Sequence, residues 1–128
     1  MKLALFADIH SNLEAITACL AQARALGAER YAFLGDLVGY GADPVAVLDL
    51  IEEHAAAGAV VVLGNHDAAA LGHPVGGLTG SALEAVEWTR RQLGENARAF
   101  VRNWTWDRVA LLHVEAWERI VRLSKQIR

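Results

Sequence analysis

Residues 59–67 read Ala-Val-Val-Val-Leu-Gly-Asn-His-Asp. An apolar run rich in β-branched residues is typical of a buried strand, and here it ends in a glycine followed by three polar side chains. The arrangement occurs twice upstream, where residues 2–7 precede Asp8-Ile9-His10 and residues 31–34 precede Gly35-Asp36. Asp8, Asp36 and Asn65 are 28 and 29 residues apart, about one strand–helix–strand step. The spacing therefore predicts three parallel strands.

The segments between these strands have helical periodicity. We expect a helix over residues 11–26, opened by a capping box of Ser11 and Glu14, and a second over residues 43–57, opened by Asp43 and Pro44. Residues 68–80 are predicted to be a loop, and a third helix to about residue 93 is expected to open with Ser81 and Glu84. Further on we expect a short helix over residues 95–103, a strand over 107–114 and an amphipathic helix over 115–127. The pattern predicts a single α/β domain over residues 1–128 with a βαβαβ front half.

The polar segments after the strands are candidates for chemistry. Right-handed crossovers place the carboxyl ends of parallel strands at one edge of the sheet, where α/β proteins bind ligands. Asp8 and His10 are two residues apart, so on extended chain both side chains point the same way. Together with the carboxylate of Asp36 and the amide oxygen of Asn65 they form a mixed oxygen and nitrogen donor set. Such a set suits Mn, Fe, Zn or Co.

The motifs Asp8-Ile9-His10, Gly35-Asp36 and Gly64-Asn65-His66-Asp67 resemble those of the calcineurin-like metallophosphoesterase superfamily. Residues 35–44, GDLVGYGADP, resemble its small bacterial phosphoesterase branch, and the resemblance runs to about residue 100. It implies a layered α/β/β/α fold and two divalent metal ions. Asp8 and His10 would bind the first ion, Asp36 would bridge both, and Asn65 would bind the second.

The resemblance also implies a reaction. A hydroxide held between the ions would attack the phosphorus of a small phosphate mono- or diester. His66 would contact the phosphate and give a proton to the leaving oxygen, while Asp67 would steady that turn. The expected activity is therefore that of a metal-dependent hydrolase.

The chain departs from the family pattern in two places. Where many members have GDxxDR, with an aspartate that orients the catalytic histidine, this chain has Gly39 and Tyr40. The downstream His-Gly and Gly-His-x-His turns that complete the metal site are absent; His113 is the remaining candidate for the second ion, with a histidine packed against protein as the alternative. We therefore interpret the chain as a C-terminally truncated or divergent member, divergent over residues 101–128.

Composition limits the other function classes. Residues 1–67 carry nine acidic and three basic side chains, whereas residues 68–128 carry six and nine. The interrupted basic stretch does not predict a nucleic-acid polymer as partner, and no apolar run is long enough to predict a membrane span. The single cysteine fits a cytoplasmic protein, and the tryptophans near the C-terminus could form a contact in a homo-oligomer. Two alternatives stay open: a non-catalytic or weakly active family member that binds metal or a partner, and a metal-independent α/β binding module.

Overall fold

The structure is a computed structural model that describes residues 1–78, 80–94 and 99 of the chain. Several sequence predictions lie outside these residues. They are the helix over 95–103 (except residue 99), the strand over 107–114, the helix over 115–127, the ligand role of His113 and the divergence of residues 101–128.

The described residues contain a parallel three-stranded sheet of order β1-β2-β3. The strands are β1 (Leu3–Phe6), β2 (Arg30–Phe33) and β3 (Val60–Val61). Leu3 pairs with Arg30 at the start of the first two strands, and Phe33 pairs with Val61 at the end of the last two. The three predicted parallel strands are confirmed, although β3 is shorter than the apolar run that predicted it.

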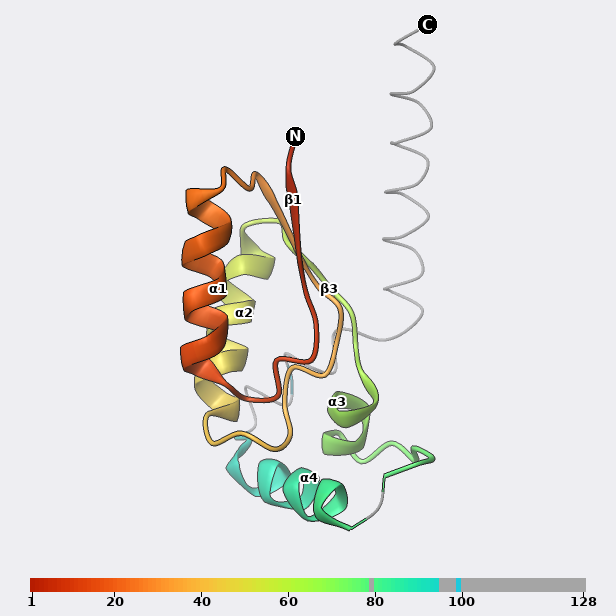
Figure 1. Cartoon of the computed structure of the whole chain (residues 1–128). Helices are drawn as coiled ribbons and strands as arrows, with labels where there is room; N and C mark the ends of the chain where they lie inside the picture. Colours follow the sequence, from red (N-terminus) through yellow and green to blue (C-terminus); the bar gives the residue numbers. More distant parts are fainter. Residues whose placement is uncertain (79, 95–98, 100–128) are drawn as a thin grey trace, which may run out of the picture.

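Two helices, α1 (Leu13–Ala25) and α2 (Pro44–Ala56), lie side by side on one face of the sheet (Figure 1). Each buries an apolar stripe against the strands. The core residues are Ile16 and Leu20 from α1, Val47, Leu48 and Ile51 from α2, and Phe33 and Val61 from the sheet. Because the three strands are parallel, the polar turns that follow them lie at one edge of the sheet.

The first turns of two helices differ from the capping boxes that the sequence predicts. The N-cap of α1 is Asn12, whose Oδ1 accepts a hydrogen bond from the amide of Ala15 at 2.9 Å. Ser11 instead lies one residue upstream, in the preceding turn. Helix α4 (Ser81–Gln92) has Gly80 as its N-cap, with no side-chain capping bond. Both predicted N-cap positions were wrong by one residue. The turn before α1 ends one residue later than the helical periodicity suggests, and the turn before α4 ends one residue earlier.

A short helix, α3 (Asn65–Ala70), follows directly after the third polar turn. The prediction of a loop from residue 68 was therefore wrong for its first three residues. Helices α3 and α4 lie beyond the carboxyl ends of the strands (Figure 1), and they contact each other. Together with the turns they enclose the end of the sheet at which the candidate site lies.

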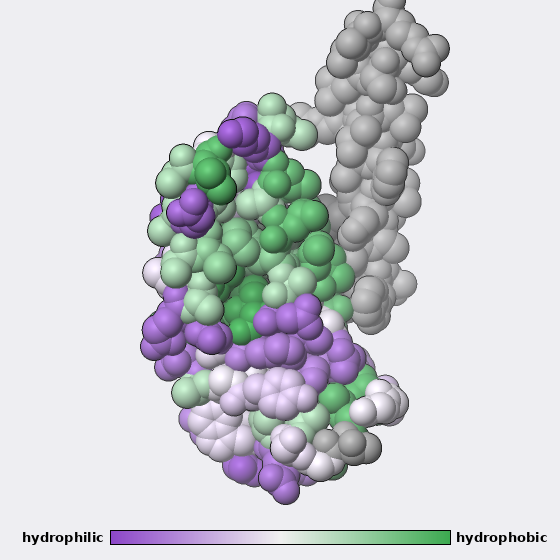
Figure 2. All heavy atoms as spheres, in the orientation of Figure 1, coloured by the Kyte–Doolittle hydropathy of each residue, from purple (hydrophilic) through white to green (hydrophobic). Residues whose placement is uncertain are grey.

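The far face of β1 is apolar. Leu3 and Leu5 alternate with the core-facing positions, and their side chains are 53% and 58% exposed. In Figure 2 this apolar surface over the strands ends at a band of polar residues at the lower end of the sheet. In the part of the chain that the structure describes, no helix has both the length and the apolar character needed to cross a membrane.

Candidate metal centre and active site

Backbone hydrogen bonds continue the pairing of β1 and β2 into the turns that follow them. The amide of Asp8 donates to the carbonyl of Gly35 at 3.3 Å, and the amide of His10 donates to the carbonyl of Asp36 at 2.9 Å. The amide of Ser11 extends the series by donating to the Leu37 carbonyl at 2.9 Å. These bonds fix the first polar turn against the second, so the convergence that the spacing predicts is present.

The backbone of these turns is not extended. Among the residues that the structure describes, five other than glycine have positive φ angles between 49° and 57°, and all five lie in the first two turns: Asp8, His10, Ser11, Asp36 and Tyr40. The expectation that Asp8 and His10 lie on extended chain was therefore wrong. Such conformations cost free energy and concentrate at functional sites, where surrounding bonds hold them. Here the turn-to-turn hydrogen bonds supply that support.

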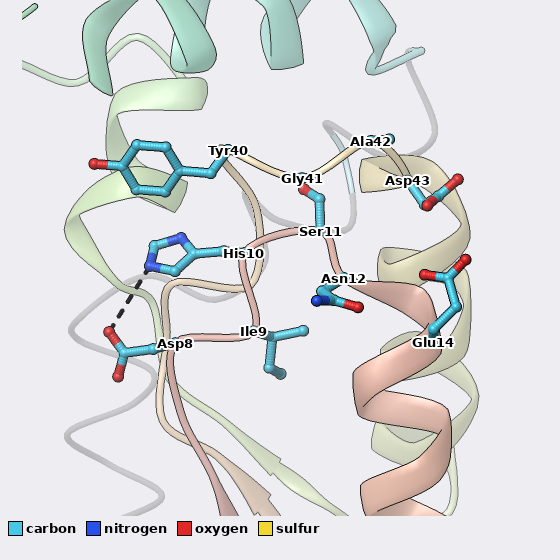
Figure 3. A pocket seen from close by; sticks show the side chains of 10 residues that line it. All are labelled: Asp8, Ile9, His10, Ser11, Asn12, Glu14, Tyr40, Gly41, Ala42 and Asp43. Atoms are coloured by element: carbon cyan, nitrogen blue, oxygen red, sulfur yellow. Dashed lines mark ion pairs between the residues drawn. The ribbon is translucent and has the colours of Figure 1, made fainter. Parts of the chain in front are cut away.

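The side chains of Asp8, His10 and Asp36 form a group in which one ligand atom from each lies within 4.8 Å of the others. Figure 3 shows His10 above Asp8, with the Nε2 of His10 at 3.8 Å from the Oδ1 of Asp8. The Nδ1 of His10 lies 3.2 Å from the carbonyl oxygen of Val38. A carbonyl oxygen only accepts, so in a neutral His10 ring this contact places the proton on Nδ1 and leaves the lone pair on Nε2. This tautomer is the one that can bind a metal through Nε2.

Asn65 brings a further donor atom to Asp36. The side-chain amide of Asn65 can be oriented with its nitrogen facing Asp36. In this orientation the nitrogen lies 3.2 Å from both carboxylate oxygens and donates to them. Turned over, the amide presents its oxygen at the same place, and three oxygens converge. Three converging oxygens repel one another unless a cation lies among them, so the donor set fits a divalent ion.

Asp67 ties the second and third turns together. Its carboxylate is fully buried and accepts three backbone hydrogen bonds, from Leu37 at 2.9 Å, Val38 at 3.0 Å and Gly64 at 2.8 Å. Burial raises the pKa of Asp67 to about 6, although the three amides act in the opposite direction. Asp67 therefore positions the turns that carry Asp36 and Asn65 and does not itself reach the open side of the site.

Close approach at Gly64 makes this geometry possible. A Cβ at Gly64 would overlap the side chain and the amide of Asp36. The adjacent amide of His66 donates to the Oδ1 of Asp36 at 3.1 Å. Glycine is required at this position because the backbone of the third turn lies directly against the carboxylate that the sequence predicts to be a metal ligand.

His66 is 5% exposed, and its Nδ1 has no hydrogen-bond partner among the described residues. A Cβ at Gly39 would lie 2.6 Å from that nitrogen. Gly39 therefore faces His66 at one of the two positions where many family members have Asp-Arg. Tyr40 covers it instead, with ring centroids 4.8 Å apart. Burial lowers the pKa of His66, outweighing the nearby Asp36 carboxylate, which raises it. Burial thus favours the neutral form of the His66 ring.

The structure brings the predicted residues of the three turns to one place, while His113 lies outside the described residues. Sequence reasoning missed two contributors. The carbonyl of Val38 sets the tautomer of His10, and Tyr40 forms a wall over the two histidines, with its ring 4.9 Å from that of His10. Both lie in the glycine-rich stretch of residues 35–44, whose concentration of glycines was the available signal that its backbone approaches the site.

Comparison with known proteins agrees with the fold and the site. The calcineurin-like phosphoesterase family matches residues 1–123 of the chain, and the chain belongs to this family. A metallophosphoesterase from Sphaerobacter thermophilus of known structure is 30% identical, with a TM-score of 0.66. A hypothetical protein from Pyrococcus horikoshii is 24% identical, with a TM-score of 0.64, and supports the fold. An uncharacterized protein of Methanocaldococcus jannaschii is 43% identical over 70 residues.

The chain is shorter than these proteins. The aligned region covers 82% of this chain and 41% of the Sphaerobacter protein, and 78% of this chain and 46% of the Pyrococcus protein. For the Methanocaldococcus protein the shares are 55% of this chain and 28% of the relative. The chain thus spans less than half the length of the relatives it matches.

Proposed function

We propose that this protein is a metal-dependent phosphoesterase that hydrolyses a small phosphate mono- or diester. The observation that carries the proposal is the cluster of Asp8, His10 and Asp36, whose ligand atoms lie within 4.8 Å of one another at the carboxyl edge of the sheet. Family membership gives the reaction class, and the donor set fits a divalent ion such as Mn, Fe, Zn or Co.

The residues take separate roles in this proposal. Asp8 and the Nε2 of His10 would hold one ion, Asp36 would contribute to that ion and to a second, and Asn65 would serve the second through its amide oxygen. Bound divalent ions lower the pKa of water and stabilise both the attacking and the leaving oxygen of an in-line displacement. Asp67 holds the turns that carry these ligands. The cytoplasm is the proposed compartment, in keeping with the single cysteine.

His66 is the proposed proton donor to the leaving oxygen. Its Nδ1 faces Gly39 and is buried, so Nε2 is the nitrogen left to act on a substrate. Because no carboxylate orients the imidazole from the Gly39 position, the ring depends on packing against Tyr40 and His10, whose ring centroids lie 4.8 and 4.9 Å away. This arrangement favours small esters over protein phosphatase activity.

Hydrolysis of p-nitrophenyl phosphate and of its bis ester, measured with added Mn²⁺, tests the proposal. Asp36→Asn and His66→Ala are expected to lower the rate by about 10² or more, the usual effect of removing one stabilising group. Glu53→Gln, at an exposed position of α2, is the matched control. A rate that both active-site variants leave unchanged would refute the proposal. Metal binding without hydrolysis would instead support the non-catalytic alternative.

A further inference from the structure

The imidazole ring of His66 is oriented without a hydrogen bond from the residues that the structure describes. Its side chain is almost fully buried, and its Nδ1 has no partner among them. A hydrogen-bonding side chain does not fit beside that nitrogen, because a Cβ at Gly39 would already lie 2.6 Å from it. Gly39 also has a φ of 96°, a conformation that favours glycine. Packing therefore sets the direction in which the Nε2 of His66 points.

Two neighbouring rings supply that packing. The ring centroids of His10, Tyr40 and His66 lie 4.8 or 4.9 Å apart in all three pairs, with interplanar angles between 47° and 76°. Tilted and edge-on contacts at this distance are the ones that aromatic rings prefer. Figure 3 shows the ring of Tyr40 lying over that of His10. His10 is held in addition by the contact of its Nδ1 with the carbonyl of Val38 at 3.2 Å, so Tyr40 is the partner whose placement needs a separate cause.

A strained turn places Tyr40 against the two histidines. The amide of Gly41 donates to the carbonyl of Gly39 at 2.7 Å and to that of His10 at 3.0 Å, which closes a three-residue turn around Tyr40. The φ of Tyr40 is 57°, which is rare for a bulky residue and costs free energy. Tyr40 is nevertheless 55% exposed, so burial of its ring returns little to the fold. A strained backbone that holds a largely exposed ring is explained by a role in the site.

We propose that Tyr40 is the positioning residue of His66, whose ring fixes the imidazole in the orientation from which Nε2 gives its proton. This rests on the proposed function, in which His66 is the proton donor. Tyr40 acts through the face of its ring and not through its hydroxyl. It also lines the pocket of about 570 Å³ beside Asp8 and His10, so the ring that packs on His66 borders the open side of the site.

The kinetic test uses the full chain with Mn²⁺ and an alkyl phosphate, whose leaving oxygen needs a proton. Tyr40→Ala should lower kcat about 10- to 100-fold with little change in KM, the usual cost of misplacing a catalytic group. Tyr40→Phe keeps the ring and should restore most of that loss. Val45→Ala, which truncates an exposed side chain in the first turn of α2, is the matched control and should keep the wild-type kcat.

A double variant shows whether Tyr40 acts through His66. In the His66→Ala background, Tyr40→Ala should lower kcat by less than about 2-fold further, because the effects of residues that act as a unit do not add. A loss that persists in this background would mean that Tyr40 contacts the substrate directly, and it overturns the inference. Tyr40→Phe that is as slow as Tyr40→Ala overturns it as well, because the hydroxyl would then be the acting group.

A measurement on the metal-free chain reports on the ring itself. In the full chain labelled with ¹³C at histidine, the NMR order parameter of the His66 ring should fall in Tyr40→Ala and recover in Tyr40→Phe. That of His10, which Val38 also holds, should change less. An unchanged order parameter of His66 overturns this inference alone. Hydrolysis that Asp36→Asn and His66→Ala leave unchanged overturns the proposed function instead, and the order parameter then decides whether Tyr40 holds the ring.

Discussion

Replacing Asp67 with asparagine removes a buried carboxylate while nearly preserving the shape of the side chain. The Oδ1 atom can still accept from the amides of Leu37 and Val38, which lie at 2.9 and 3.0 Å. The bond from the amide of Gly64, at 2.8 Å, is lost because an amide nitrogen takes the place of the second oxygen. The variant therefore isolates the charge of this residue from most of its contacts.

The magnitude follows from the pKa of Asp67, which rises from 3.8 to about 6 on folding. A carboxyl with a raised folded pKa binds a proton more tightly in the folded state. Its contribution to stability is therefore fully present below pH 3.8 and is lost as the pH rises through about 6. At 1.36 kcal/mol per pKa unit, the loss reaches about 3 kcal/mol for this nearly fully buried group.

The assay is urea unfolding of both proteins in the presence of a metal chelator, repeated from about pH 4 to about pH 7. Across this range the unfolding free energy of the wild-type chain should fall relative to that of Asp67→Asn by about 2–3 kcal/mol. Asp49→Asn, at an exposed position of α2, controls for removal of one carboxylate. A difference between wild type and Asp67→Asn that stays constant with pH would refute the reasoning.

Three further predictions concern the turns and the proton donor. Gly64→Ala should lower the unfolding free energy by about 1–3 kcal/mol and weaken Mn²⁺ binding, because its Cβ would overlap Asp36. Gly94→Ala, whose Cβ would meet no described atom within 4 Å, should do neither. Urea unfolding measures the stability and metal titration measures the binding. Asn12→Ala should cost about 1 kcal/mol in thermal unfolding through loss of the α1 cap, and an unchanged midpoint would contradict that cap. With an alkyl phosphate, kcat/KM should fall as the pH rises through the pKa of His66, which burial lowers from 6.5, because the protonated ring is the proposed proton donor. In His66→Ala this fall of kcat/KM with pH should be absent.

Much of the front half could be predicted from the sequence because its signals are local. The apolar runs at residues 2–7, 31–34 and 59–63 predicted β1, β2 and β3, and the periodic segments between them became α1 and α2. Even spacing then placed the turns at one edge, since right-handed crossovers leave little choice of topology. These features depend on hydrophobic burial and chain connectivity, which a single sequence expresses directly.

The local geometry of the turns was harder to predict. Asp8 and His10 have positive φ angles of 54° and 49°, a conformation that only tertiary hydrogen bonds to the second turn make favourable. The helix caps were misplaced for a similar reason, because Ser11 is held by the carbonyl of Leu37 and Asn12 takes the capping position. A sequence pattern does not contain these long-range bonds.

The roles of individual site residues were predictable only in part. The motifs predicted the candidate metal-binding set, and the absence of the family aspartate at residue 39 or 40 was visible from the sequence. That Gly39 lies directly against the Nδ1 of His66 is a tertiary fact. The same holds for Asp67, whose three backbone partners come from two turns that are far apart in the chain.

The metal centre is the central claim, and metal content tests it most directly. The full chain, incubated with Mn²⁺ and freed of unbound ions, should retain about one ion or more per chain when measured by mass spectrometry of the metal, and Asp36→Asn should lose most of it. Glu53→Gln should retain the wild-type amount. Less than about 0.1 ion per wild-type chain, or equal retention by Asp36→Asn, would contradict a metal centre at Asp8, His10 and Asp36.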